Sequence, residues 1–234
     1  MKAEKKRKQK KRGEAMAPRA DRHDLYQRAV QDPESDIDFL ERVWREAYGD
    51  ADEPRHFRED FCGTALLCGE WVARGPERTA EGYDIDGTTL AWGLERNITP
   101  RGEAADRVAL HELDVREPGE RLADIRCAHN FSYQIFRERA VLLDYLRKVR
   151  AGLSERSVFV MDLFGGSEAI EELEEERDIE DGAFTYVWEQ RSFHPATSHT
   201  ECYIHFRMPD GSALREAFHY SWRLYTPPEL RDLV

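Results

Sequence analysis

A chain of 234 residues with 40% hydrophobic side chains and a net charge of −12 is large enough for one domain with a real core. Eleven Phe, nine Tyr and five Trp argue against disorder of the whole chain. No apolar run approaches the ~18 residues that a membrane span needs, and no apolar segment follows the N-terminal charges as it would in a secretory signal. We therefore expect a cytoplasmic protein.

The N-terminus is strongly basic, although the chain as a whole is acidic. Residues 1–12 hold eight Lys or Arg and one Glu, and we predict a disordered basic arm over residues 1–22. Such an arm could make weak contact with RNA or another polyanion. A solvated tail is the favoured interpretation, because the acidic remainder has no matching basic stripe. Nucleic acid is accordingly disfavoured as the main partner.

Two helices are predicted between His23 and Tyr48, where apolar residues recur at helical spacing. Asp32-Pro33 separates them, because proline ends a helix and restricts the residue before it. Ser35 or Asp36 is the expected N-cap of the second helix.

Strands and helices then alternate from His56 to Phe164, which predicts an α/β fold with a doubly wound, mostly parallel sheet. The first strand begins at His56 and ends in a turn at Gly63, after which an apolar helix follows. A later helix ends at Gly152 as its C′ residue. Further strands are predicted at residues 79–85, 108–113, 125–131 and 158–164.

The C-terminal part has a different pattern. Residues 168–181 are a charge run, for which we expect a solvated helix, with a mobile lid as the alternative. After Gly182 the period changes to two, which predicts an insert of antiparallel strands joined by turns. Thr226 should cap a short terminal helix. The α/β core thus covers residues 23–166, and the acidic helix with antiparallel strands covers residues 167–234, in the same domain or a small subdomain.

Acidic residues stand at the carboxyl ends of successive strands, where ligands bind in open α/β sheets. Asp84 follows Gly63 by close to the ~20 residues typical of an acid that accepts ribose hydroxyls. Asp114 ends the next strand and could accept an adenine amino group, with Val115 packed against the ring. Helix capping is the alternative role for such acids, and Asp86 and Asp60 are open to it.

The turn after the first strand, FCGTA over residues 61–65, contains one glycine. A dinucleotide fold needs G-x-G-x-x-G so that the backbone can approach the pyrophosphate. No Gly-Lys-Ser/Thr follows that would make a P-loop. A nucleoside without phosphates fits this turn better, and this favours S-adenosylmethionine.

From Tyr26 to Gly166 the chain resembles class I S-adenosylmethionine-dependent methyltransferases that act on small molecules. The resemblance implies a Rossmann-like fold with S-adenosylmethionine as cofactor. In the family's first motif, acid-x-Gly-x-Gly-x-Gly, Phe61 and Ala65 replace the outer glycines. The motifs that carry the resemblance are EDFCGT (59–64), GYDID (82–86), LDV (113–115), HNFSY (129–133) and FVMDLFGG (159–166).

The resemblance also implies a role for each matching residue. Glu59 is the acid of the first motif, and Gly63 is its middle glycine. Asn130 lies near the methyl donor, and Tyr26 covers the cofactor. The expected cofactor-binding residues are Tyr26, Glu59, Gly63, Asp84, Ile85, Asp114, Val115 and Asn130.

We therefore expect methyl transfer by in-line displacement to an N or O atom of a small-molecule acceptor. The sulfonium is already activated, so alignment and exclusion of water supply much of the rate. No general base is assigned, and no metal site is predicted, because the cysteines lack metal-ligand spacing. Candidates to line the acceptor pocket are His129, Tyr133, His194 and Tyr225.

Two alternatives stay open. The first is an NAD(P)-dependent Rossmann oxidoreductase, which the single-glycine turn disfavours. The second is a non-catalytic binding protein on a methyltransferase fold, with the basic arm as its interaction element. The family's sheet usually continues into two more strands after the helix at Thr226, so we expect this edge of the sheet to be missing or replaced by the insert.

Overall fold

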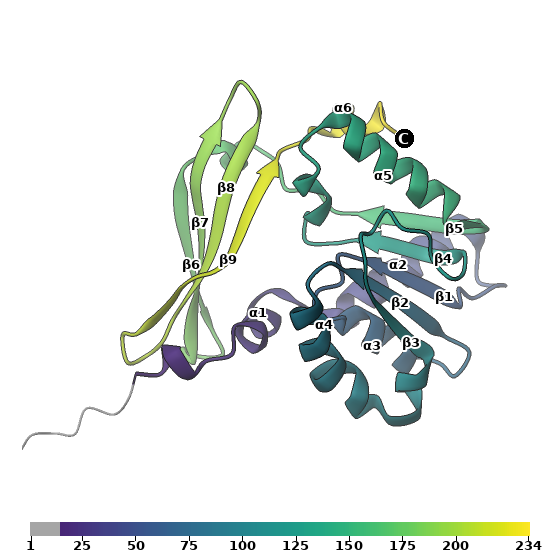
Figure 1. The fold of residues 1–234 in the computed structure, drawn as a ribbon, viewed down its shortest axis with the longest axis horizontal. Coiled ribbons are helices and arrows are strands. Elements are labelled where there is room, and N and C mark those ends of the chain that lie inside the picture. The colour runs from purple at the N-terminus through teal and green to yellow at the C-terminus, as the bar shows by residue number, and fades with distance from the viewer. Residues whose placement is uncertain (1–14) are drawn as a thin grey trace, which may run out of the picture.

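The computed structural model describes residues 15–234, which form two sheets side by side (Figure 1). The predicted fold class, a doubly wound parallel sheet with a C-terminal antiparallel insert, is confirmed. In the parallel sheet the strand order is β3-β2-β1-β4-β5, with β1 (His56–Asp60), β2 (Thr79–Asp84), β3 (Val108–Glu112), β4 (Ala123–Ala128) and β5 (Leu153–Met161). The antiparallel sheet contains, in order, β6 (Leu173–Ile179), β7 (Phe184–His194), β8 (His199–Arg207) and β9 (Ala213–Arg223).

Aspartates start the two N-terminal helices, α1 (Arg22–Val30) and α2 (Pro33–Tyr48). The expectation that Ser35 or Asp36 caps α2 is wrong. Asp32 is the cap, because proline is well suited to the first helical position and the Asp32 carboxylate accepts the Ser35 N–H at 3.2 Å. Of the predicted basic arm, residues 1–14 lie outside the described residues, whereas Ala17–Arg19 form a 3₁₀ turn.

Helices cover both faces of the parallel sheet. On one face α2 and α3 (Leu66–Ala73) bury a cluster that includes Phe57 and Trp71. On the other face α5 (Arg139–Ala151) packs Tyr145 and Leu142 toward the sheet. The remaining helical segments are α4 (Gly87–Gly93), a π-helical turn at Leu94–Ile98, 3₁₀ turns at Thr99–Arg107, Ser132–Ile135 and Glu168–Ile170, and α6 (Pro227–Arg231), which Thr226 caps as predicted.

No helix accompanies the crossover from β3 to β4 (residues 113–122), which passes over β2 and β1 (Figure 1). Charged side chains lie beneath it. Asp60 accepts from Arg58 Nε at 2.9 Å, from Arg126 Nε at 2.7 Å and from the Tyr145 hydroxyl at 2.6 Å. Arg58 and Arg126 both donate to the carbonyl oxygen of Val115. Hydrogen bonds from two buried, ion-paired arginines therefore attach the crossover to this face of the sheet.

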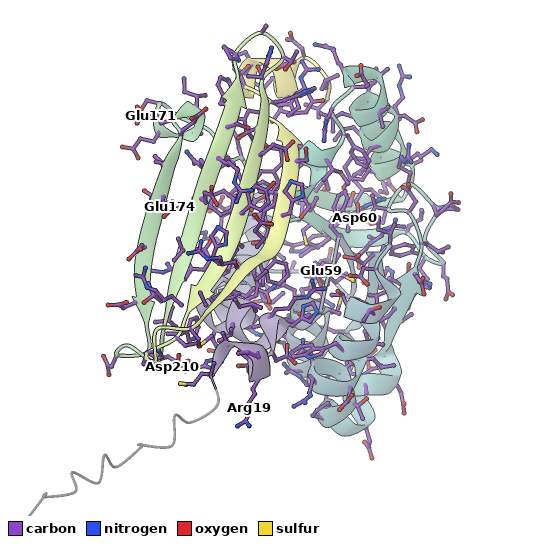
Figure 2. All side chains as sticks on the ribbon, turned by 60° about the vertical axis from the view of Figure 1, so that its left-hand side comes forward. Arg19, Glu59, Asp60, Glu171, Glu174 and Asp210 are labelled. Carbon is purple, nitrogen blue, oxygen red and sulfur yellow. The ribbon has the colours of Figure 1, made fainter. Side chains whose placement is uncertain are left out.

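The charge run at residues 168–181 is a strand, and the expectation of a solvated helix is wrong. After a 3₁₀ turn at Glu168–Ile170, residues 173–179 pair with β7 as β6. The run alternates: Glu175 lies opposite Trp188 and faces inward, whereas Glu174 lies opposite Glu189 and faces outward. Figure 2 shows Glu171 and Glu174 on the side of this sheet away from Glu59 and Asp60.

Helix α1 lies between the antiparallel sheet and the α/β core (Figure 1). Its Leu25 and Ala29 pack with Phe184, Ile204 and Phe206 on the inner face of the sheet. This contact leaves the upper part of the inner face turned toward the carboxyl ends of the parallel strands.

Candidate functional site

The turn between β1 and α3 has left-handed backbone at every second residue. Phe61 has φ 57°, Gly63 φ 52° and Ala65 φ 54°. These are the three glycine positions of the motif that the sequence resembles, so the turn keeps the conformation without two of the glycines. Left-handed backbone costs an L-residue about 1–2 kcal/mol, and tertiary hydrogen bonds such as that from Cys62 N–H to the Tyr83 carbonyl at 2.9 Å offset this strain.

Asp84 holds the same turn from the neighbouring strand. One of its carboxylate oxygens accepts the Gly63 N–H at 2.8 Å, and the other accepts the Asp86 N–H at 2.9 Å. Asp86 itself caps α4 by accepting from Thr88 and Thr89. Each Asp84 oxygen retains a free lone pair, so the carboxylate can support the turn and still accept hydroxyl groups of a ligand.

A cavity of about 540 Å³ opens above this turn, in the size range of small-molecule and cofactor sites. It lies between the carboxyl ends of β1, β2 and β4, helix α1 and the edge strand β9. Five residues of the predicted cofactor set line it: Tyr26, Glu59, Gly63, Asp84 and Asn130. Further lining residues include His23, Thr64, His129, Phe218 and Tyr220.

Three predicted residues lie outside this cavity. Asp114 forms two hydrogen bonds with the Arg116 guanidinium, at 2.9 and 2.7 Å. Val115 is 3% exposed and packs in the core, whereas Ile85 is 72% exposed. The adenine-binding role of Asp114 and Val115 thus stays a prediction, and it requires Asp114 to serve both Arg116 and a base.

Glu59 is buried at the floor of the cavity. It accepts hydrogen bonds from the Cys68 N–H at 3.3 Å and from the Cys68 thiol at 3.2 Å. Burial raises the pKa of Glu59 to about 8, so the side chain is largely protonated at neutral pH. A positive group entering the cavity would favour its ionised form.

The turn after β4 is also strained and is held by a residue that sequence reasoning missed. Asn130 and Phe131 have φ 55° and 59°, and their N–H groups donate to the two carboxylate oxygens of Asp162, both at 2.8 Å. Asp162 directly follows β5, and its place after an apolar strand was the available signal. Burial lowers the pKa of the adjacent His129, which is therefore neutral at pH 7.

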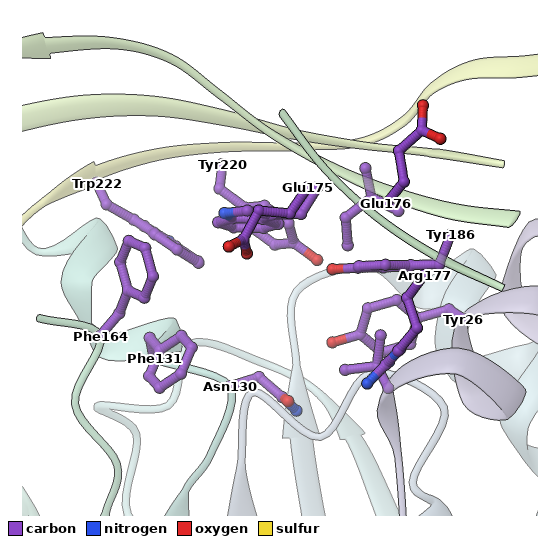
Figure 3. A pocket seen from close by; sticks show the side chains of 13 residues that line it. Tyr26, Asn130, Phe131, Phe164, Glu175, Glu176, Arg177, Tyr186, Tyr220 and Trp222 are labelled. Atoms are coloured by element: carbon purple, nitrogen blue, oxygen red, sulfur yellow. The ribbon is translucent and has the colours of Figure 1, made fainter. Parts of the chain in front are cut away.

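A second cavity, of about 650 Å³, adjoins the first and shares Tyr26, Asn130, Tyr220 and Trp222 with it. Its walls are mainly aromatic (Figure 3). The inner face of the antiparallel sheet contributes Tyr186, Trp188, Tyr220 and Trp222, and the core contributes Phe131 and Phe164. Period-two patterning predicted the strands, but it could not show that this face closes a cavity.

Of the four candidates for the acceptor pocket, His129 alone lines one of these two cavities. Tyr133 is fully buried. Tyr225 donates its hydroxyl proton to the Phe136 carbonyl in the core. His194 lies at the end of β7, where its ring contacts the Thr197 hydroxyl at 3.1 Å.

Two further searches bear on the kind of site. Within residues 15–234 no three His, Cys, Asp or Glu side chains are grouped so that they could hold a metal ion. In the same part of the chain, no helix has the length and apolarity required to cross a membrane.

No protein-family model and no curated protein sequence matches the chain. Its fold is that of S-adenosylmethionine-dependent methyltransferases of known structure. One such enzyme, from Clostridium acetobutylicum, is 18% identical with a TM-score of 0.67, over 90% of this chain and 83% of that chain.

Two further neighbours extend over nearly the whole chain. The sugar N-methyltransferase KedS8 from a Streptoalloteichus species is 18% identical (TM-score 0.67; 95% of this chain and 85% of that chain). DesVI from Streptomyces venezuelae is 13% identical (TM-score 0.71; 92% and 88%). Coverage this wide includes the antiparallel sheet, which is therefore part of the shared fold.

Proposed function

We propose that this protein transfers a methyl group from S-adenosylmethionine to a small-molecule acceptor. The observation that carries the proposal is the pair of adjoining cavities. One cavity lies at the strand ends beside Glu59, Gly63 and Asp84, and the other has aromatic walls. They meet at Tyr26 and Asn130, so ligands in both would be neighbours, as a direct displacement between donor and acceptor requires.

The residues of the first cavity suit a cationic nucleoside. Asp84 would accept the ribose hydroxyls, as acids at this strand end do in nucleotide-binding folds. Glu59 would face the ammonium of the methionine part and become ionised. Gly63 keeps the turn free of a side chain, and Asp114 with Val115 and Ile85 would contact the adenine.

Bound S-adenosylmethionine supplies a methyl group that is activated by the sulfonium, so the protein has to orient the acceptor and exclude water. Asn130 and Tyr26 are placed for this, because each lines both cavities. Asp162 acts through the backbone by holding Asn130 in its left-handed conformation. These roles require no metal ion.

Calorimetry with S-adenosylmethionine tests the proposal. Asp84→Ala should weaken binding by ~1–3 kcal/mol, because ligand hydroxyls lose their acceptor. Asp84→Asn separates this loss from damage to the turn, since an amide oxygen can still accept the Gly63 N–H. Glu174→Gln, on the outer face of the antiparallel sheet, is the matched control and should bind as the wild type does.

Each other result has a meaning. Absence of binding would overturn the proposal, and binding of a nicotinamide dinucleotide instead would favour an oxidoreductase. Unchanged affinity in Asp84→Ala would remove the ribose assignment. Tight binding without transfer of labelled methyl to any metabolite pool would favour a non-catalytic binding protein.

A further inference from the structure

We propose that the aromatic cavity is the acceptor site and that the acceptor is an amine without phosphate or carboxylate groups. This inference rests on the proposed methyl transfer and deepens it, because it chooses nitrogen over oxygen as the accepting atom. The support comes from the wall chemistry, the charges at the cavity and its junction with the donor cavity.

The rings of the cavity are arranged around a common space (Figure 3). The ring centroids of Trp188 and Trp222 are 6.1 Å apart, those of Tyr220 and Trp222 are 4.6 Å apart, and Phe164 lies 6.2 Å from Trp222. Aromatic faces attract cations through their quadrupoles, and tryptophan does so most strongly. A neutral acceptor would lack this electrostatic attraction.

The ionised groups at the cavity also favour a cation. Glu175 lies opposite Trp188 in the register and therefore on the inner face of the sheet. In Figure 3 its carboxylate lies beside Tyr220. The Glu176 side chain turns outward to pair with Arg207. A carboxylate at this place could form a charge-assisted hydrogen bond with a bound ammonium.

An anionic acceptor would meet one cation in this cavity. Among the described residues that line this cavity, Arg177 is the one cation. Its guanidinium donates to the Ala29 carbonyl at the end of α1 and lies 5.5 Å from the Tyr186 ring centroid. A phosphate or carboxylate would thus be attracted by one guanidinium that already donates to Ala29, and it would be repelled by the Glu175 carboxylate in the same wall.

The junction of the two cavities is where the methyl group would pass. Tyr26, Asn130, Tyr220 and Trp222 line both cavities. A side-chain hydrogen bond joins Tyr26 and Tyr220 at this point. An acceptor nitrogen bound among the rings would therefore face the donor at the place where Tyr26 and Tyr220 line both cavities.

The charge balance of the reaction fits these walls. The acceptor ammonium first gives one proton to water at the open mouth, which frees its lone pair. The nitrogen then forms a bond to the methyl carbon while the carbon–sulfur bond breaks with its electrons going to sulfur. The sulfonium becomes a neutral thioether and the nitrogen becomes positive. Rings and carboxylate around the nitrogen stabilise the charge where it arrives, a benefit that an alcohol losing its proton does not receive.

Binding of a cationic probe tests the site without any turnover. We expect choline to quench the fluorescence of Trp188 and Trp222, and its neutral isostere 3,3-dimethylbutan-1-ol to bind about tenfold more weakly. Glu175→Gln should weaken choline binding about fivefold, and Trp188→Leu should weaken it further. Glu174→Gln, one residue along the same strand but on the outer face, is the matched control. Equal binding of choline and its neutral isostere would overturn the proposal.

A turnover assay adds the second arm. With S-adenosylmethionine, a panel of benzylamines should accept methyl groups, whereas benzyl alcohols and phosphorylated or carboxylated amines should not. Methylation of the alcohols would overturn the assignment. Methylation of the anionic amines at a rate equal to that of the benzylamines would also overturn it, because the proposed acceptor is an amine without phosphate or carboxylate groups. All variants should bind S-adenosylmethionine as the wild type does. Failure of the wild type to bind it would count against the proposed function. The choline measurement would still test whether the aromatic cavity binds cations.

Discussion

The two sheets differ in what they bury. Beneath the crossover at residues 113–122 the parallel sheet buries charge, with Asp60 between Arg58 and Arg126. On its inner face the antiparallel sheet buries rings, and it keeps its ion pairs, such as Arg207–Glu176, on the exposed outer face. Both sheets therefore use charged residues, but in the parallel sheet they are structural and in the antiparallel sheet they are largely solvated.

This difference predicts which substitutions destabilise each of the two sheets. A buried charge that loses its partner leaves an uncompensated ion in a desolvated site, whereas an exposed charge is rehydrated by water. The parallel sheet should thus respond strongly to single changes in charge, and the antiparallel sheet should respond mainly to changes in its rings.

The largest effect is expected from Asp60→Asn. The substitution leaves two buried guanidinium groups without their carboxylate, which should lower the free energy of unfolding by ~3–5 kcal/mol in urea titrations. Tyr145→Phe removes one hydrogen bond from the same cluster and should cost about 1–2 kcal/mol. Glu176→Gln on the antiparallel sheet should leave stability nearly unchanged. A loss of similar size in Glu176→Gln and Asp60→Asn would break the comparison.

An intermediate effect should appear in acid. Glu81, beneath the crossover, contacts His56 Nε2 at 3.2 Å and accepts the Tyr83 hydroxyl at 3.0 Å. Burial raises the pKa of Glu81, but these contacts outweigh it and hold the pKa at about 2. Because this is below the ordinary value, the stabilisation is complete above about pH 4.5 and is lost as the pH falls toward 2. Glu81→Gln should lower the free energy of unfolding at pH 6 by about 2 kcal/mol and flatten its dependence on pH, as measured by urea unfolding between pH 2.5 and 6.

Glu189 provides the matched case on the antiparallel sheet. The Arg191 guanidinium, together with His205, lowers the pKa of Glu189 to about 2. The Glu189 side chain is more exposed than that of Glu81, 17% against 3%, so 1 M salt should screen its contribution, whereas the contribution of Glu81 should persist. Equal sensitivity to salt at both sites would show that the crossover does not shield Glu81.

The smallest effect concerns the strained turn. Ala65→Gly removes a left-handed alanine, a gain of ~1–2 kcal/mol, but also a buried methyl group, a loss of ~0.8 kcal/mol. We expect a net rise in the free energy of unfolding of no more than about 1 kcal/mol. Gly63→Ala, at the same backbone conformation, should lower the free energy of unfolding. Destabilisation by both changes would mean that packing, and not strain, dominates this turn.

Much of the parallel sheet could be predicted from sequence, because its strands end in acids and its helices carry regular apolar spacing. Asp84 and Gly63 could be proposed as site residues for the same reason: their spacing follows from the length of one βα unit. The buried cluster at Asp60 could not be found, since alternating charged residues in a strand normally indicate a solvated face.

The aromatic cavity could not be predicted for a different reason. The residues that form the aromatic cavity, such as Phe131 and Trp188, come from segments far apart in the chain, and their meeting depends on how the antiparallel sheet lies against the core. Asp114 differs from these residues because its partner, Arg116, is close in the sequence. The strand-end position of Asp114 nevertheless did not indicate this ion pair.

The acidic run that forms β6 also bears on self-association. Among the described strands, β6 pairs with β7 alone, so its other edge has unpaired backbone groups. A strand of another copy could form backbone hydrogen bonds with such an edge, and charged side chains disfavour this pairing. Residues 174–176 are three consecutive glutamates, so two such edges that approached each other would bring like charges together. The same composition that looked like a solvated helix therefore keeps an open sheet edge from becoming a site of aggregation.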